Sequence, residues 1–155
     1  MGKLKTAPIF SVVILLFVAT TTVARVPDPV HWTFAAKKKT ADTFEVVLTA
    51  SVDPPWHIFS QNTGSGGPVP TSIVFKSNPS IVLTGKPKEM GKLMKAFDGN
   101  FQTHVIYYSN RVRFVTTVRA RGSENLRLVG IVEYQAATDS EVLPPVKRSF
   151  DIPLQ

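Results

Sequence analysis

Apolar and polar residues alternate with a period of two along most of the chain, which is typical of β-strands that bury one face. The alternation is clearest in residues 42–51, where every even position from Phe44 to Ala50 is apolar. It recurs in two further long segments, residues 111–121 and 126–134. Shorter segments that also predict strands are 30–36, 56–61, 71–76, 81–85, 104–109 and 146–152. This pattern predicts antiparallel sheets with one buried and one more polar face.

Segments rich in Gly, Pro, Asn, Asp and Ser separate the predicted strands. They are residues 53–55, 63–70, 77–80, 109–110 and 121–125. The 12 prolines concentrate in the connections, because proline cannot donate a ladder hydrogen bond. About nine short strands with this spacing predict an all-β fold built as a two-sheet β-sandwich. Residues 85–101 lack the alternation, so we expect a long ordered loop there, with at most a short helical turn.

The N-terminus has the pattern of a secretory signal peptide. Lys3 and Lys5 precede an apolar run from Ile9 to Ala19, and a small residue, Ala24, follows at a suitable cleavage position. The run is shorter than the ~20 residues that a membrane span requires. We therefore expect a signal peptide at residues 1–24, one exported domain at residues 25–155, and no stable membrane span after cleavage.

Composition removes several classes of function. The 155-residue chain contains no cysteine, which excludes thiol redox chemistry and thiolate metal sites in this chain. Its net charge of +7 is not accompanied by a basic and aromatic recognition motif, so no nucleic-acid partner is predicted. His31, His57 and His104 fall on separate predicted strands without metal-ligand spacing. No nucleophile motif is present, so we predict no metal, no cofactor and no enzymatic activity.

Five segments in a fixed order carry a family resemblance. They are DPVHWTFAAKK (28–38), DPPWHIFSQ (53–61), GGPVPTSIVF (66–75), HVIYYSNRVRF (104–114) and GIVEYQAATDSEVLPP (130–145). Together they resemble the N-terminal periplasmic domain of the thiol:disulfide interchange protein DsbD, in the version common in Bacteroidetes-type bacteria. The resemblance covers essentially the whole chain after the signal peptide. It implies an immunoglobulin-like β-sandwich in the periplasm and a periplasmic protein partner, such as a thioredoxin-like or DsbD-type redox protein.

In that family two cysteines beside the last long strand exchange electrons beneath an aromatic cap loop. The resemblance places these cysteines on Ala137 and Val142. Neither residue forms a thiolate, which is the nucleophile of disulfide exchange. The resemblance therefore implies a redox-inactive protein-interaction module that binds through residues 134–145 and the 85–104 segment.

The candidate binding residues are Phe97, Asp98, Phe101, Tyr134, Ala137, Asp139 and Val142. Phe97 and Phe101 can form a lid over the 137/142 loop, or they can simply anchor their own segment to the core. Asp98 and Asp139 can be polar elements of a site, or they can hydrogen-bond their own turns, as aspartates in turns commonly do.

Two other functions remain open from the sequence. A partner chain could supply both thiols for disulfide interchange. Alternatively, exposed aromatic residues could form a carbohydrate-binding platform, although the aromatic residues of the strands are expected mainly in the core. These aromatic residues are Trp32, Trp56, Tyr107, Tyr108 and Tyr134.

Overall fold

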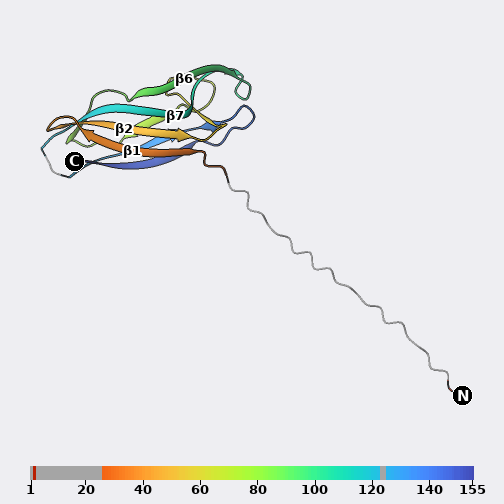
Figure 1. Cartoon of the computed structure of the whole chain (residues 1–155), viewed down its shortest axis with the longest axis horizontal. Coiled ribbons are helices and arrows are strands. Elements are labelled where there is room, and N and C mark those ends of the chain that lie inside the picture. The colour runs from red at the N-terminus through yellow and green to blue at the C-terminus, as the bar shows by residue number, and fades with distance from the viewer. Residues whose placement is uncertain (1, 3–25, 123–124) are drawn as a thin grey trace.

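The computed structural model describes residues 2, 26–122 and 125–155, and in these residues every regular element is a β-strand. Nearly all of the predicted signal peptide lies outside the described residues. Ten strands are present in the described part of the chain (Figure 1). They are β1 (Val30–Lys38), β2 (Thr43–Val52), β3 (His57–Phe59), β4 (Ser72–Phe75), β5 (Ile81–Leu83), β6 (Lys88–Asp98), β7 (Thr103–Ala120), β8 (Leu126–Tyr134), β9 (Ala136–Ala137) and β10 (Val146–Leu154).

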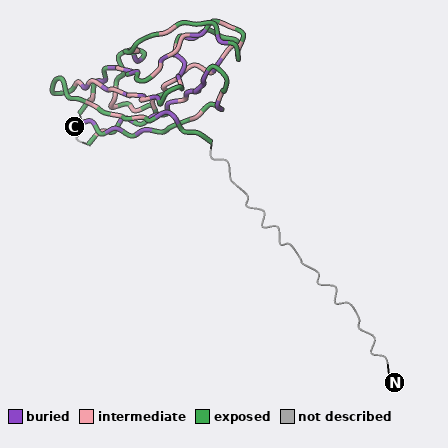
Figure 2. The backbone as a smooth tube through the Cα atoms, turned by 45° about the vertical axis from the view of Figure 1, so that its right-hand side comes forward, coloured by how far each residue is buried: buried purple, intermediate pink, exposed green. Residues whose placement is uncertain are grey.

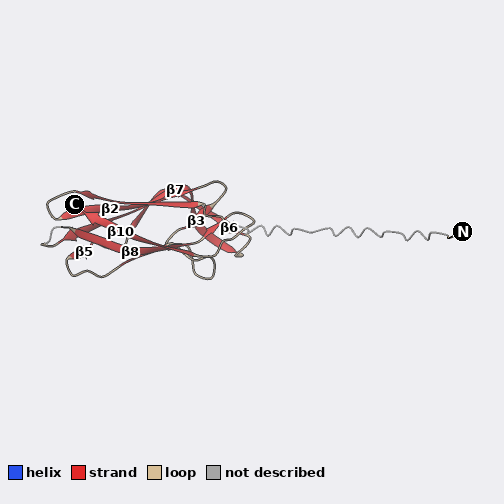
Figure 3. Cartoon of the chain, turned by 90° about the horizontal axis from the view of Figure 1, so that it is seen from below, coloured by secondary structure: helices blue, strands red, loops and turns tan. Residues whose placement is uncertain are grey.

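Two antiparallel sheets pack face to face, which confirms the predicted β-sandwich. The larger sheet has the order β1-β2-β7-β3-β9, with β5 and β6 also paired to β7, and the smaller sheet has the order β10-β8-β4. Figure 3 shows the two layers, with β2 and β7 in one layer and β8 in the other. Among the described residues, no helix is long and apolar enough to cross a membrane.

The main core lies between the two sheets and follows the predicted alternation. The even-numbered residues of β2, and those of β7 from Val112 to Val118, are buried, and they pack in one core with Leu128 of β8 and Phe150 of β10. Figure 2 shows these buried positions alternating with exposed ones along the strands. Gly130 is required where β8 passes under Phe150, because a Cβ at this position would lie only 2.3 Å from the Phe150 ring.

The predicted turn at residues 109–110 is an irregularity inside one strand. Residues 103–120 form the continuous 18-residue strand β7, whose Asn110 has a positive φ of 65°. The same point separates the part of β7 that pairs with β2 from the part that pairs with β3. Asparagine tolerates this left-handed conformation better than most residues, so the turn signal in the sequence is real, although it bends a strand instead of ending it.

The prediction of a long loop at residues 85–101 is wrong, because most of this segment forms the 11-residue strand β6. β6 pairs only with β7, so it is one of the edge strands of the larger sheet among the described residues. Most of its side chains are exposed on both faces, and an acidic residue, Glu89, takes an inward position. An edge strand of this kind has no apolar alternation to recognise, which is why the sequence pattern does not reveal it.

Candidate functional site

Ala137 and Val142 are direct partners in an antiparallel β-bridge. On one side of the bridge the Thr138 amide donates to the Glu141 carbonyl at 2.8 Å, and on the other side the Leu143 amide donates to the Ala136 carbonyl at 2.9 Å. The bridge is therefore a non-hydrogen-bonded pair, in which the two Cα atoms lie only about 4.5 Å apart. This spacing is at the short end of the range that a disulfide spans, about 4.4–6.8 Å.

The turn that joins the two positions, residues 138–141, is closed by its own hydrogen bonds. The buried Thr138 hydroxyl accepts from the backbone amides of Ser140 at 3.3 Å and Glu141 at 3.0 Å. Asp139, in contrast, makes no side-chain hydrogen bond with any described residue and is exposed. Thr138, and not Asp139, therefore supplies the side-chain acceptor that stabilises this turn.

Strand β9 has one side chain in each of two apolar clusters. Ala136 pairs with Ile58 and lies in the main core, together with Leu143. Ala137 pairs with His57 and lies on the opposite face of the larger sheet, because successive side chains of a strand point to opposite faces. On that face a second cluster of buried residues forms beyond the sandwich core. Its members are Phe59, Val105 and Ala137, with Phe101, Tyr107 and Val142 packed against them.

A loop over the second cluster connects β6 to β7, and we refer to residues 98–103 as the cap loop. Asp98 stabilises it, since its Oδ1 atom accepts from the backbone amides of Asn100 at 2.8 Å and Phe101 at 3.3 Å. The Asn100 side chain donates to the Thr138 carbonyl at 3.3 Å. The cap loop is thus tied directly to the 138–141 turn.

Phe101 in the cap loop and Phe97 just before it have different environments. Phe101 packs edge-on against Phe59, with ring centroids 5.7 Å apart, and it covers the cluster that contains Ala137. Phe97 is 56% exposed and packs edge-on against His104 at 5.5 Å. The structure therefore places Phe101 over the 137/142 bridge, while Phe97 stands at the surface beside it.

Tyr134 does not join this group. Its side chain is only 2% exposed and packs in the main core against Trp32, with ring centroids 5.5 Å apart. Burial raises the pKa of Tyr134 above its usual value. A partner at the surface cannot contact this side chain, which supports the core structure instead. Tyr108 is equally buried, so neither residue is available for an exposed aromatic platform.

A hollow of about 140 Å³ lies beside the cap loop. It is lined by His57, Ala96, Phe97, Asp98, Gly99, Val105, Tyr107 and Asp139. His57 is 6% exposed, and its Nε2 atom has no hydrogen-bond partner in the described part of the chain. Burial lowers the pKa of His57, while the negative charges of Asp98 and Asp139 act in the opposite direction. The sequence does not identify His57 and Tyr107 as residues of this site, because only the pairing of β3 with β7 and β9 brings them there.

A second acidic residue holds β6 in place. The Glu89 carboxylate accepts hydrogen bonds from the Tyr108 hydroxyl at 3.0 Å, the Ser60 hydroxyl at 2.7 Å and the Gln61 amide at 2.6 Å. Burial and this carboxylate raise the pKa of Tyr108 to about 12. These bonds fix β6, and therefore the start of the cap loop, against the body of the sandwich.

Within residues 2, 26–122 and 125–155, no group of three or more His, Asp or Glu side chains is placed to hold a metal ion. His57, Asp98 and Asp139 all line the hollow beside the cap loop, but they are not placed to share one ion.

Comparison with solved structures relates this arrangement to known domains. The N-terminal periplasmic domain of ScsB from Proteus mirabilis matches with a TM-score of 0.56 and 16% sequence identity, over 83% of this chain and 47% of the other. The N-terminal domain of Neisseria meningitidis DsbD, in its reduced form, matches with a TM-score of 0.50 and 18% identity, over 81% of this chain and 85% of the other. The chain has a DsbD-like fold. At this level of identity the likeness concerns the fold, and the chain spans about half the length of the ScsB structure.

Comparisons of sequence alone give a different result: no protein-family model matches the chain, and no curated protein sequence matches it. The DsbD-like fold is an immunoglobulin-like β-sandwich, as the resemblance implies. The absence of cysteine distinguishes this chain from a domain that carries a redox pair.

Proposed function

We propose that this chain is a periplasmic, redox-inactive docking module that binds a partner protein through the cap loop and the 138–141 turn. One observation carries the proposal: the turn keeps two directly facing positions, Ala137 and Val142, and fills them with carbon side chains. Disulfide exchange needs a thiolate at such positions. The geometry for a cross-strand bridge is present, but the reactive atoms are absent.

Only some of the predicted binding residues are exposed to a partner. Ala137 is completely enclosed, and Val142 is partly covered in the same cluster as Phe101, so these three residues shape the site from beneath. The exposed positions are Phe97 beside the cap loop, Gly99, Asn100 and Gln102 in the cap loop, and Asp139, Ser140 and Glu141 in the turn. Phenylalanine is enriched at protein–protein interfaces, so the exposed Phe97 suits the role of a contact residue.

Two observations support the periplasm and a redox protein as the partner. Both similar structures are described as N-terminal domains of ScsB and DsbD, the first of them periplasmic. The N-terminal sequence predicts export. We infer that a thioredoxin-like or DsbD-type protein occupies the surface and meets no thiol there, so the complex forms and separates without electron transfer.

Capture from a periplasmic extract tests the proposal. The bait without its predicted signal peptide is compared with a double variant, Phe97→Ala with Ser140→Arg, that alters both exposed parts of the surface. The matched control is Val74→Ala with Ser149→Arg, because both residues are exposed and pair with Ile131 on the smaller sheet. A thioredoxin-like or DsbD-type partner should be retained by the parent and the control and lost from the double variant. Equal recovery with all three baits would contradict the proposed surface.

A further inference from the structure

We propose that strand β6 is a docking edge for an extended, acidic segment of a partner protein, which adds to the larger sheet as a further strand. This edge is distinct from the docking surface proposed above, since it involves residues 88–95 and not the cap loop or the 138–141 turn. Its features are an unpaired backbone, uncompensated lysines and exposed apolar side chains on one long edge strand.

The backbone groups of β7 show which side of β6 remains unpaired. The Thr117 carbonyl accepts from the Thr84 amide on the β6 side of β7, and the Ile106 carbonyl accepts from the Ser60 amide on the β3 side. Because residues of an antiparallel strand turn their N–H and C=O groups alternately to either side, the odd-numbered residues of both halves of β7 are turned towards β6.

The register then identifies the free backbone groups of β6. Residues of β6 that lie opposite odd-numbered residues of β7 are bonded to it, and the residues between them turn their N–H and C=O groups away from β7. These outward residues are Glu89, Gly91, Leu93 and Lys95. No other described strand pairs with β6. Each outward residue offers one donor and one acceptor, which is what a peptide pairs with when it adds to a sheet edge.

The other edges of the two sheets are covered or short. Strand β1, at the opposite edge of the larger sheet, packs against β10 of the smaller sheet. Strands β4, β5 and β9 have only four, three and two residues. Strand β6 has 11 residues and runs along the rim of the molecule (Figure 1). It therefore has the length that pairing with an extended segment requires.

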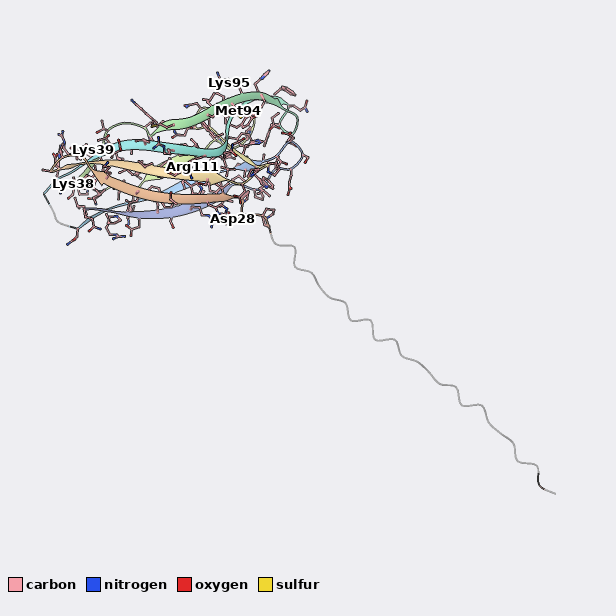
Figure 4. All side chains as sticks on the ribbon, in the orientation of Figure 1. Asp28, Lys38, Lys39, Met94, Lys95 and Arg111 are labelled. Atoms are coloured by element: carbon pink, nitrogen blue, oxygen red, sulfur yellow. The ribbon has the colours of Figure 1, made fainter. Side chains whose placement is uncertain are left out.

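The charge of this edge selects an acidic partner. Lys88, Lys92 and Lys95 are exposed, and none of them forms an ion pair with a described residue. Figure 4 shows Lys95 at the rim of the molecule. The two carboxylates of β6 are already hydrogen-bonded, Glu89 within the sandwich and Asp98 to the cap loop. Carboxylates on an added strand can pair with the lysines, as oppositely charged cross-strand neighbours do.

The same lysines disfavour a second copy of β6 as the occupant. Lysine on an edge strand hinders pairing between identical edges, because like charges on neighbouring strands destabilise a sheet. Met90 and Leu93 stand between the lysines and are 48% and 47% exposed. Apolar side chains of an added strand can pack against them, so we expect the partner segment to alternate acidic or polar residues with apolar ones.

NMR titration of the isotope-labelled chain without its predicted signal peptide tests the edge directly. The probe is the acetylated and amidated peptide EVTVEVTVE. One control is KVTVKVTVK, and the other is the acidic peptide N-methylated on three consecutive central residues, which keeps its charge but loses backbone donors. The acidic peptide should give saturable shifts at residues 88–95 and in the neighbouring part of β7. Neither control should shift these resonances.

Hydrogen exchange shows whether the backbone of β6 takes part. With the acidic peptide at saturation, the amides of Gly91, Leu93 and Lys95 should exchange roughly fivefold more slowly, because each gains a hydrogen bond. The amides of Met90 and Met94 should change little, since they are already bonded to β7.

Two substitutions at Lys95 separate charge from backbone. Lys95→Gln should weaken binding of the acidic peptide by roughly threefold, as expected for loss of one exposed charge pair. Lys95→Pro also removes an amide that faces away from β7, a place where an edge strand tolerates proline, and should weaken binding by about tenfold. The controls are Lys37→Gln in β1 and Leu83→Pro in β5, where the amide of Leu83 also faces away from β7. Both should bind like the parent.

Equal binding of the acidic and basic peptides would overturn the docking edge, and so would equal binding by Lys95→Pro and Lys95→Gln. Equal binding of the N-methylated peptide would also overturn it, and would reduce β6 to a basic surface open to any polyanion, an anionic membrane included. Failure of the docking function is a different result. If the acidic peptide binds as expected, while the Phe97→Ala and Ser140→Arg bait captures the same partners as its parent, the edge is supported and the cap-loop surface is refuted.

Discussion

The Asn100 side chain donates a hydrogen bond to the Thr138 carbonyl at 3.3 Å, and so links the cap loop to the turn that carries the 137/142 bridge. The two residues are 38 positions apart in the chain. They belong to segments that the docking proposal combines into one surface. The first prediction concerns this link.

Asn100→Ala should loosen the cap loop without unfolding the domain. Loss of the bond to Thr138 should cost about 1 kcal/mol locally, which corresponds to roughly fivefold faster amide exchange at Phe101. Hydrogen exchange measured by NMR at neutral pH reports the change. Asn62→Ala is the control, since the exposed side-chain amide of Asn62 makes only a 3.5 Å contact with the Glu89 carboxylate. Unchanged protection of Phe101 in the Asn100 variant would show that the link does not hold the cap.

A cysteine pair at positions 137 and 142 should form a disulfide. The two residues face each other in a non-hydrogen-bonded bridge, and such pairs have the short Cα separation that a disulfide accepts. After oxidation, mass spectrometry should show the loss of two hydrogens. The oxidised form should be more stable to urea than the reduced form by about 2 kcal/mol, because the closed loop is short.

The single variants Ala137→Cys and Val142→Cys are the controls for this pair, and each should retain one free thiol. Two free thiols in the double variant under oxidising conditions would contradict the geometry of the bridge. Formation of the disulfide would also permit a direct assay of whether the restored thiols exchange with a thioredoxin-like protein.

Removal of the Tyr108 hydroxyl should destabilise the whole domain. Tyr108 is 2% exposed and donates to the Glu89 carboxylate at 3.0 Å. A hydrogen bond to a charged group contributes about 1.5–3 kcal/mol, so Tyr108→Phe should lower the free energy of unfolding by this amount. Tyr107→Phe should have a smaller effect, because in the described part of the chain no hydrogen bond is found for the Tyr107 hydroxyl. Urea denaturation of both variants makes the comparison, and equal losses would exclude a special role for the Glu89 bond.

His57 should make the domain less stable in mild acid. Burial lowers its pKa in the folded state below the usual value of 6.5, so between these two pKa values the unfolded chain binds a proton that the folded chain does not. The stability that neutral His57 provides is therefore complete above pH 6.5 and is lost progressively as the pH falls towards the folded-state pKa.

Urea denaturation between pH 7.5 and pH 5 checks this effect. His57→Leu should lose less stability over this range than the parent, because leucine does not titrate. His104→Leu should follow the parent, since His104 is exposed. If His57→Leu lost as much stability as the parent between pH 7.5 and pH 5, another group would be responsible for the acid sensitivity.

The sequence allowed the sandwich to be predicted wherever one face of a strand is buried and the other is not. β2, β7 and β8 fulfil that condition, and their alternation matches the observed burial. β6 does not, because its edge position leaves both faces exposed. The two-residue strand β9 is too short to produce any periodicity, and only its pairing with β3 reveals it.

The candidate site could be predicted only in part from the sequence. The resemblance pairs Ala137 with Val142, and it leaves open whether Phe101 covers them or anchors its own segment; the structure brings the three residues into one cluster. Tyr134 is among the candidate binding residues because it begins the 134–145 segment, but its side chain is buried in the core, as expected for an aromatic residue of a strand. The sequence does not bring His57 together with Asp98 and Asp139, because their approach depends on three long-range strand pairings.

Because β9 places Ala136 in the main core and Ala137 in the second cluster, the adjoining turn cannot shift without disturbing the packing on both sides of the sheet. The turn is thus preorganised before any partner arrives. Association then requires little loss of conformational entropy from this loop. For the docking surface proposed above, we therefore expect partners to differ by their fit in shape and charge, and differences in affinity to appear mainly in how fast complexes dissociate.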